Sequence, residues 1–255
     1  MFIPPGFDTA LALEAADLVK QAYDQYFANK QGQPWNLQGN YENLALLSAK
    51  PDGFFAHIEP FGFVARNKAT GTVFVTYRGT VSPEDWLSNI TFPQVPFHDQ
   101  WGSVEKGFSE LYVQTSASVT NAVKHSGAAK VVVTGHSLGS SLATLATADL
   151  VINGVIPSMY NFASPRAGDP DFARKLQASV PALWRVVNTE DIVTTVPLAT
   201  AAFASDIKSL SAYGLLHALN KLNFMHVGLP VSFTVNHGSI VDNHKMDTYK
   251  AALLG

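Results

Sequence analysis

The pentapeptide Gly-His-Ser-Leu-Gly at residues 135–139 constrains the fold of this chain more than any other stretch. It follows a β-branched run at 130–134, which predicts a buried strand, and it precedes a segment rich in Ala and Leu, which predicts a helix. The turn between them is sharp, and a Cβ at either flanking glycine would collide with the neighbouring strand or helix. Gly-x-Ser-x-Gly in this strand–turn–helix context predicts a nucleophile elbow that presents the hydroxyl of Ser137 at the top of a sheet.

The same region offers donors for a developing oxyanion. Ser137 would stand at the N-terminus of the helix, so the free backbone N–H of Leu138 and the positive end of the helix dipole would face the oxyanion. A second donor is expected upstream, where a strand ends in glycine and a hydroxyl residue. Gly79 and Thr80 meet that description, because they lie just after a predicted strand at 72–77.

The predicted elements around the elbow form an α/β pattern. Strands at 61–66 and 72–77 are separated by five turn-forming residues, which predicts a hairpin, whereas the proline-punctuated stretch 90–107 predicts an irregular loop. The remaining predictions are helices at 9–27, 108–125, 171–179 and 245–254 and strands at 158–163, 183–187 and 231–235. Because strands alternate with helices after the hairpin, we expect one domain over residues 1–255 with a mainly parallel sheet.

Composition excludes several classes of function. The chain has 255 residues, of which 17 are basic and 20 acidic, and the net charge of −3 argues against a nucleic-acid partner. It contains no cysteine and no nucleotide-binding glycine motif, and we expect no metal or cofactor. No run reaches the ~18 apolar residues of a membrane span. The N-terminal stretch lacks the basic and apolar regions of a signal peptide, so we expect a cytoplasmic chain or a secreted one whose signal has been removed.

A serine nucleophile on this kind of sheet requires an acid and then a base further along the chain. Asp191 follows the second predicted strand after the elbow, at the edge where open α/β sheets form active sites. It is favoured over Asp169, which also suits a helix cap, and Glu190 competes by charge alone. His237 and His244 both follow the last predicted strand, and spacing alone does not choose between them.

Seven strings of residues occur in one order over residues 72–249: TYRGTVSPEDWLSN, VEKGF, VTGHSLGSSLATLA, NFASPRAGD, NTEDIVTTVP, HVGLP and NHKMDTY. Together they resemble the class 3, or fungal-type, triacylglycerol lipase family over about two-thirds of the chain. The resemblance implies an α/β-hydrolase fold, with helices on both faces of the sheet and a helical lid or cap. It also implies site residues, namely the catalytic Ser137, Asp191 and His244 and the oxyanion donors Thr80 and Leu138. The lack of cysteine departs from the disulfide-bonded fungal members and is typical of a bacterial-type member.

The resemblance implies a carboxylic ester hydrolase, a lipase that cleaves acylglycerols or other fatty-acyl esters through an acyl-enzyme. The same residues would serve a phospholipase A1, a feruloyl esterase or an acyltransferase, because the acyl pocket and the acceptor distinguish these enzymes. An inactive binding module is a further alternative, although candidates are intact at all five positions. The expected partner is a lipid or other ester substrate, met at a transient lipid–water interface, and we expect a monomer.

Two stretches flank the predicted catalytic loops and are expected to cover the site. Residues 82–97 carry Trp86 and Leu87 among polar and acidic residues, which suits a short amphipathic lid. In 198–224, apolar residues that include Leu210 and Leu216 recur at spacings near three and four, which predicts a helix with one apolar face. We expect this second stretch to be a cap whose apolar face lines the acyl pocket; ordinary core packing is the alternative.

Overall fold

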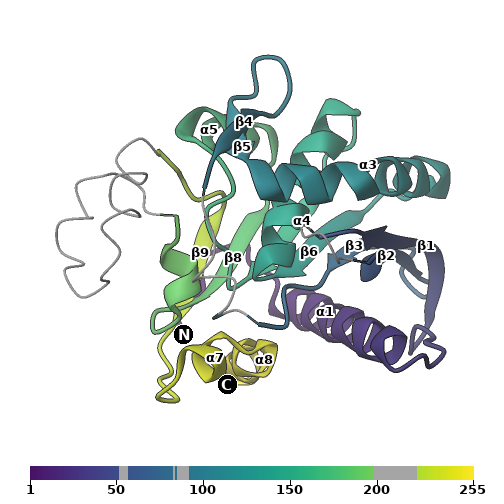
Figure 1. Ribbon diagram of the computed structural model, residues 1–255, viewed down its shortest axis with the longest axis horizontal. Helices are drawn as coiled ribbons and strands as arrows, with labels where there is room; N and C mark the ends of the chain where they lie inside the picture. The colour runs from purple at the N-terminus through teal and green to yellow at the C-terminus, as the bar shows by residue number, and fades with distance from the viewer. Residues whose placement is uncertain (52–56, 83, 85–91, 198–222) are drawn as a thin grey trace.

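A computed structural model gives the fold and describes residues 1–51, 57–82, 84, 92–197 and 223–255. Its centre is a seven-stranded sheet in the order β1-β2-β3-β6-β7-β8-β9 (Figure 1). The strands are β1 (Tyr41–Ala49), β2 (Glu59–Asn67), β3 (Val73–Tyr77), β6 (Val131–His136), β7 (Ser158–Phe162), β8 (Leu183–Asn188) and β9 (Leu229–Phe233). The first three strands pair antiparallel, and every pair from β3 to β9 is parallel. The predicted mainly parallel sheet is therefore confirmed.

Helices cover both faces of this sheet, as predicted. One face carries α1 (Thr9–Lys30) and α8 (Met246–Leu254), which also contact each other. The other face carries α3 (Lys106–Ser126) and α4 (Leu138–Ile152), with α5 (Pro170–Ser179) beside them (Figure 1). In β6, Val131 and Val133 join the cluster under α3 and α4, and Val132 joins the cluster under α1. Burial on both faces explains the unbroken β-branched run that predicted this strand.

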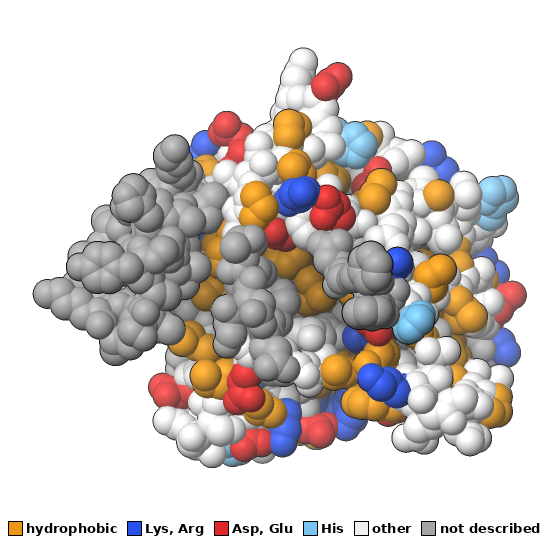
Figure 2. All heavy atoms as spheres, in the orientation of Figure 1, with side chains coloured by type: hydrophobic (Ala, Val, Ile, Leu, Met, Phe, Trp, Pro, Cys, Tyr) orange, Lys and Arg blue, Asp and Glu red, His pale blue; other side chains and the backbone are white. Residues whose placement is uncertain are grey.

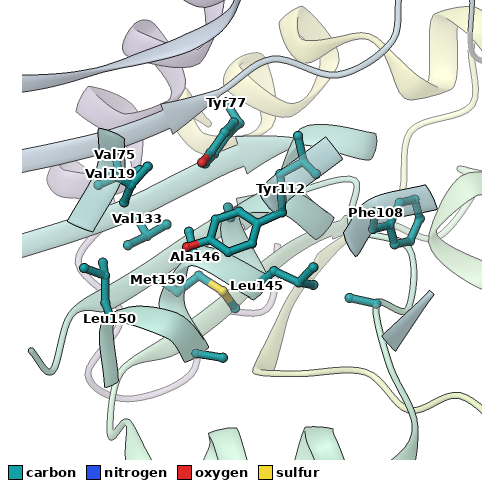
Figure 3. Packing of buried hydrophobic residues seen from close by; sticks show 14 of the residues in the cluster. Val75, Tyr77, Phe108, Tyr112, Val119, Val133, Leu145, Ala146, Leu150 and Met159 are labelled. Carbon is teal, nitrogen blue, oxygen red and sulfur yellow. The ribbon is translucent and has the colours of Figure 1, made fainter. Parts of the chain in front are cut away.

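The core under α3 and α4 locks the elbow helix against the sheet. Val75 and Tyr77 from β3 face Tyr112 from α3 and Leu145 from α4 (Figure 3). Helix α4 is buried from Leu138 to Leu150, so its sequence is apolar or small on every side and shows no amphipathic stripe. A helix enclosed in this way cannot shift without disrupting the core, which fixes its N-terminus in space.

The stretch 90–107 was predicted to be an irregular loop, and this prediction is wrong. It contains an antiparallel pair, β4 (Gln94–Pro96) and β5 (Ser103–Glu105), joined by a turn in which Gly102 has a φ of 82°. Pro96 occupies the end of a strand at an edge, where its missing N–H removes no central ladder bond. Strands of three residues are too short to produce a periodic signal, and the prolines concealed them.

Three further elements were not predicted from the sequence, one of them the 3₁₀ helix η1 (Ile192–Thr195). The strand β1 lies at an edge and is half exposed, so its apolar residues do not alternate cleanly. The helix α7 (Ile240–His244) has only five residues, fewer than two turns. It precedes α8 directly, and it lies in what the sequence indicated was a loop.

The predicted lid and cap fall largely outside the described residues. Trp86, Leu87, Leu210 and Leu216 are all outside them. Of the two stretches, the structure describes residues 82, 84, 92–97, 223 and 224. The rings of Phe92 and Phe224 are both buried and meet edge to face, with centroids 6.2 Å apart. Phe92, within the predicted lid stretch, therefore packs against Phe224 at the end of the predicted cap stretch.

The surface of the described residues carries charges of both signs. On the face shown in Figure 2, acidic and basic side chains are interspersed around hydrophobic side chains that gather near its centre. Within the described ranges, none of the helices combines the length and the apolar character that crossing a membrane requires.

Candidate active site

Ser137 sits at the turn between β6 and α4 in a sterically restricted backbone conformation. Its φ is 57° and its ψ is −130°, values that a residue with a side chain rarely adopts. A Cβ on Gly135 would lie 2.2 Å from the carbonyl oxygen of Gly139, and one on Gly139 would lie 2.3 Å from that of Arg78. Both glycines of the pentapeptide are therefore required by close approach of the backbone, as the predicted elbow demands.

The hydroxyl of Ser137 is buried at the start of α4. Its Oγ has no hydrogen-bond partner among the described residues, although nearly all buried polar side-chain atoms in proteins have one. The backbone of the residue, in contrast, is held firmly, because its N–H donates to the carbonyl of Phe162 on β7 at 3.0 Å. An unpaired hydroxyl on a fixed backbone is available to react.

Asp191 and His244 form a buried pair. Nδ1 of His244 lies 2.7 Å from Oδ2 of Asp191, and the two side chains are 4% and 0% exposed. Since an ionised carboxylate only accepts, Nδ1 carries the proton and the lone pair of the ring lies on Nε2. That Nε2 is buried and has no partner in the part of the chain that the structure describes. Asp191 caps a 3₁₀ turn, Ile192–Thr195, directly after β8, and His244 is the last residue of α7.

Tyr249 supports this pair, and sequence reasoning assigned no role to it. Its hydroxyl donates to Oδ2 of Asp191 at 2.6 Å, while the N–H of Val193 donates to Oδ1 at 3.0 Å. Burial, and after it the charge of Asp191, raises the pKa of Tyr249 well above its ordinary value, so the hydroxyl remains a donor. Spacing could have indicated it only weakly, as an apolar-face residue of α8 with a polar tip.

The alternatives that spacing left open occupy different places. Asp169 caps α5 and accepts from the N–H groups of Phe172 and Ser103, both at 2.8 Å. Glu190 accepts from the exposed Asn236 amide at 3.1 Å, and His237 is exposed on the loop after β9. The structure thus brings Asp191 together with His244, whereas Asp169 and Glu190 have other partners and His237 is exposed.

Gly79 and Thr80 lie against the elbow, at the end of β3. A Cβ on Gly79 would come within 2.7 Å of the Cβ of Ser137 and 2.6 Å of the carbonyl oxygen of His136. A larger residue there would force these neighbours to shift, so the chain at Thr80 runs close to Ser137. Leu138 is the first residue of α4, where backbone N–H groups have no partner within the helix. The two candidate oxyanion donors therefore flank Ser137 from separate elements.

Arg78 anchors this strand end and was not singled out from the sequence. Its buried guanidinium lies 4.0 Å from the ring centroid of Tyr26 and 4.4 Å from that of Phe61. It donates to the carbonyl oxygens of Pro60 and Gly79, each at 2.7 Å, and it pairs with Glu59 at 2.5 Å. A charged residue directly after a fully buried strand was the only available signal.

His226 lies close to Arg185 of β8 and to Arg166, which belongs to the loop after β7. Burial, and then the charges of Arg185 and Arg166, lower its pKa to about 2. Among the described residues, no three His, Asp or Glu side chains gather in the way that a metal site needs.

Comparisons with known proteins agree on one family. The family model described as "Lipase (class 3)" matches residues 74–201. The lipase of Rhizomucor miehei is 34% identical over 165 residues, covering 61% of this chain and 42% of that protein. Phospholipase A1 EG1 of Oryza sativa subsp. indica is 30% identical over 229 residues, covering 75% of this chain and 50% of that protein. The chain thus spans half or less of the length of these two relatives.

One solved structure that resembles this fold is of a triacylglycerol lipase whose catalytic centre is formed by a serine protease triad. It superposes with a TM-score of 0.65 at 25% identity, over 86% of this chain and 78% of that one.

Proposed function

Because this chain belongs to the class 3 lipase family, we propose that it hydrolyses carboxylic esters of fatty acids with Ser137 as the nucleophile. One observation carries the proposal. Asp191 and His244 form a buried pair, and Nε2 of His244 and the hydroxyl of Ser137 are both buried and have no hydrogen-bond partner among the described residues. The His244 ring lies beside the elbow, with its centroid 4.7 Å from that of the His136 ring.

In the proposed reaction, Nε2 of His244 takes the proton of Ser137 as Oγ bonds to the ester carbonyl carbon. The carbonyl oxygen becomes an oxyanion, which accepts hydrogen bonds from the backbone N–H groups of Leu138 and Thr80. The bond to the alcohol then breaks, and His244 passes its proton to the leaving alcohol oxygen. Water, deprotonated by the same Nε2, attacks the acyl carbon. The bond from that carbon to Oγ of Ser137 breaks, His244 returns its proton to Oγ, and the fatty acid leaves.

Asp191 supplies orientation and charge in this scheme. By holding Nδ1–H it keeps the lone pair of His244 on Nε2, and its negative charge stabilises the imidazolium that forms during each proton transfer. Each oxyanion donor is expected to contribute strongly, since loss of one typically costs about 2.7–4 kcal/mol of transition-state stabilisation.

Acylglycerols are the proposed substrate class, because the relative from Rhizomucor miehei is a lipase. Phospholipids are the second candidate, since the phospholipase A1 of Oryza sativa covers 75% of this chain. Long-chain substrates of both kinds gather at lipid–water interfaces, so the reaction is proposed to take place there. The chain is proposed to act as a monomer, because all the candidate catalytic residues come from one chain.

Rates on p-nitrophenyl acetate, butyrate, octanoate and laurate test the proposal, followed by emulsified triacylglycerol and vesicles of phosphatidylcholine. We expect hydrolysis that Ser137→Ala abolishes, and a higher rate on triacylglycerol than on phosphatidylcholine. The reverse order would favour the phospholipase. A folded wild-type chain that hydrolyses none of these esters would contradict the proposed function.

A further inference from the structure

A chain of hydrogen bonds joins three elements of the candidate site through a tyrosine of α1. The N–H of Gly79 donates to the hydroxyl of Tyr23 at 3.0 Å, and that hydroxyl lies 2.8 Å from Nδ1 of His136. Nε2 of His136 lies 2.7 Å from the carbonyl oxygen of His244. The hydrogen-bond chain therefore runs from the end of β3, through α1 and the end of β6, to α7.

The partners at the two ends fix every proton in this hydrogen-bond chain. A carbonyl oxygen can only accept, so Nε2 of His136 carries its proton and donates to His244. Nδ1 of the neutral ring is then an acceptor, and the hydroxyl of Tyr23 donates its hydrogen bond to it. The oxygen of Tyr23 is left to accept from Gly79. One proton arrangement satisfies all three bonds, so the hydrogen-bond chain specifies a single geometry.

Burial keeps both of these side chains uncharged. His136 is 3% exposed, and burial, followed by the proximity of His244, lowers its pKa well below the ordinary value. Burial also raises the pKa of Tyr23 above the ordinary value. The same hydrogen bonds therefore persist at the pH values at which esters are hydrolysed enzymatically.

Each residue that the hydrogen-bond chain reaches is a candidate site residue or is adjacent to one. Gly79 precedes Thr80, His136 precedes Ser137, and His244 is the candidate base itself. Space is closely filled at the first of these junctions, where a Cβ on Gly79 would meet the Tyr23 hydroxyl at 2.6 Å and the Cβ of Ser137 at 2.7 Å. A shift of the Tyr23 hydroxyl would thus displace the candidate oxyanion donor Thr80 and the candidate nucleophile Ser137.

We propose that Tyr23 and His136 are positioning residues that hold the Thr80 amide and the main chain of His244 in register with Ser137. This inference rests on the ester hydrolysis proposed above. Neither side chain takes part in a bond change. Their contribution lies in geometry, which matters because a misplacement of about 1 Å can cost ~100-fold in rate.

Tyr23→Phe removes the hydroxyl and keeps the ring. We expect kcat on p-nitrophenyl butyrate to fall by about 10- to 100-fold with KM changed by less than about threefold, because the loss concerns the transition state. The affinity for a trifluoromethyl ketone, which forms an oxyanion on Ser137, should weaken by a similar factor. Tyr41→Phe is the matched control: it deletes another hydroxyl bonded to α1, that to Glu14 at 2.7 Å, and should leave kcat and inhibitor affinity unchanged.

Variants of His136 test whether the two residues act as one unit. His136→Gln can still donate to the carbonyl of His244, whereas His136→Leu cannot, so the Gln variant should retain more kcat than the Leu variant. The double variant Tyr23→Phe with His136→Leu should lose no more activity than His136→Leu alone. Losses that multiply independently would overturn the proposal of a single hydrogen-bond chain.

These measurements separate the failure of this inference from the failure of the proposed function. If the wild type hydrolyses the esters, Ser137→Ala does not, and Tyr23→Phe matches Tyr41→Phe in kcat and in ketone affinity, only the positioning proposal fails. A Tyr23→Phe variant with a lower melting temperature and an unchanged kcat likewise overturns only the positioning proposal. If the folded wild type hydrolyses no ester, both proposals fail.

Discussion

The carboxylate of Asp191 accepts hydrogen bonds from three donors, Tyr249, His244 and the backbone of Val193. With this carboxylate fixed, the imidazole of His244 has one orientation and one tautomer. In the same region, two buried polar atoms lack partners among the described residues, Oγ of Ser137 and Nε2 of His244. Each such atom typically costs about 1–3 kcal/mol of stability, so the fold retains them against a penalty. A role of both atoms in the proposed reaction explains why they stay unpaired in spite of this cost in stability.

Ser137→Ala is the first prediction at the residue scale. Because the hydroxyl is a reactant in the proposed mechanism, kcat should fall by ~10⁶-fold. Because the hydroxyl contributes little to packing, the melting temperature should stay close to that of the wild type. Ser141→Ala is the matched control, because Ser141 lies on the same helix and its Oγ is also buried without a partner in the described residues. Similar activity of the two variants would contradict the assignment of the nucleophile. Ester hydrolysis rates and thermal unfolding provide the measurements.

The second residue-scale prediction compares two histidines that the spacing of the chain could not separate. His244→Ala removes the partner of Asp191 and should lower kcat by more than ~10⁴-fold. His237→Ala changes an exposed side chain on the loop after β9 and should keep nearly the full kcat. Purified variants assayed on p-nitrophenyl butyrate decide between them. An inactive His237→Ala beside an active His244→Ala would show that the base has been assigned to the wrong residue.

Elements with strong local sequence signals could be predicted. Elements that are very short, or that depend on pairing with another strand, could not. The strand β6 and the turn after it could be predicted, because burial on both faces requires an unbroken apolar run and the crowded turn requires two glycines. The pair β4 and β5, the edge strand β1 and the five-residue α7 carry too few residues or too little burial for a period to emerge. Tyr249 escaped notice for a related reason, since its role depends on a contact 58 residues away in sequence.

The junction of β3 with the elbow yields the prediction at the element scale. Gly79→Ala places a Cβ 2.6–2.7 Å from the carbonyl oxygen of His136 and from the Cβ of Ser137, neither of which can move freely. We expect a loss of about 1–3 kcal/mol in the free energy of unfolding, from overpacking. The kcat should fall by about 100-fold, because β3 and the elbow are pushed apart at the oxyanion donors.

Gly107→Ala is the control for this steric argument. The Cβ added there would approach only the end of the Glu105 side chain, at 3.2 Å. Urea unfolding and kcat should both stay near the wild-type values. If Gly79→Ala is as active and as stable as Gly107→Ala, the tight contact between β3 and the elbow does not govern the site.

At the scale of the whole molecule, the fold encloses histidines that must remain neutral. His136 lies between α1 and the elbow, and His226 lies near Arg185 and Arg166. Burial is the main cause of the lowered pKa of each ring, and nearby groups add to it, Arg185 and Arg166 in the case of His226. Their neutrality couples the stability of the entire chain to pH, because unfolding would expose both rings to water and allow them to bind protons.

The sign of this coupling follows from the direction of the shifts. The pKa of His226 is about 2 in the folded chain against an ordinary value of 6.5, so below pH 6.5 the unfolded chain binds a proton that the folded chain does not. Stability is therefore fully present above that pH and is lost as the pH falls, at about 1.4 kcal/mol per pH unit for each such ring. Between pH 7 and pH 5, the free energy of unfolding of the wild type should drop by about 2 kcal/mol more than that of His226→Asn. Urea unfolding at intervals across this range gives both slopes, and equal slopes for the two proteins would mean that His226 does not stay neutral inside the fold.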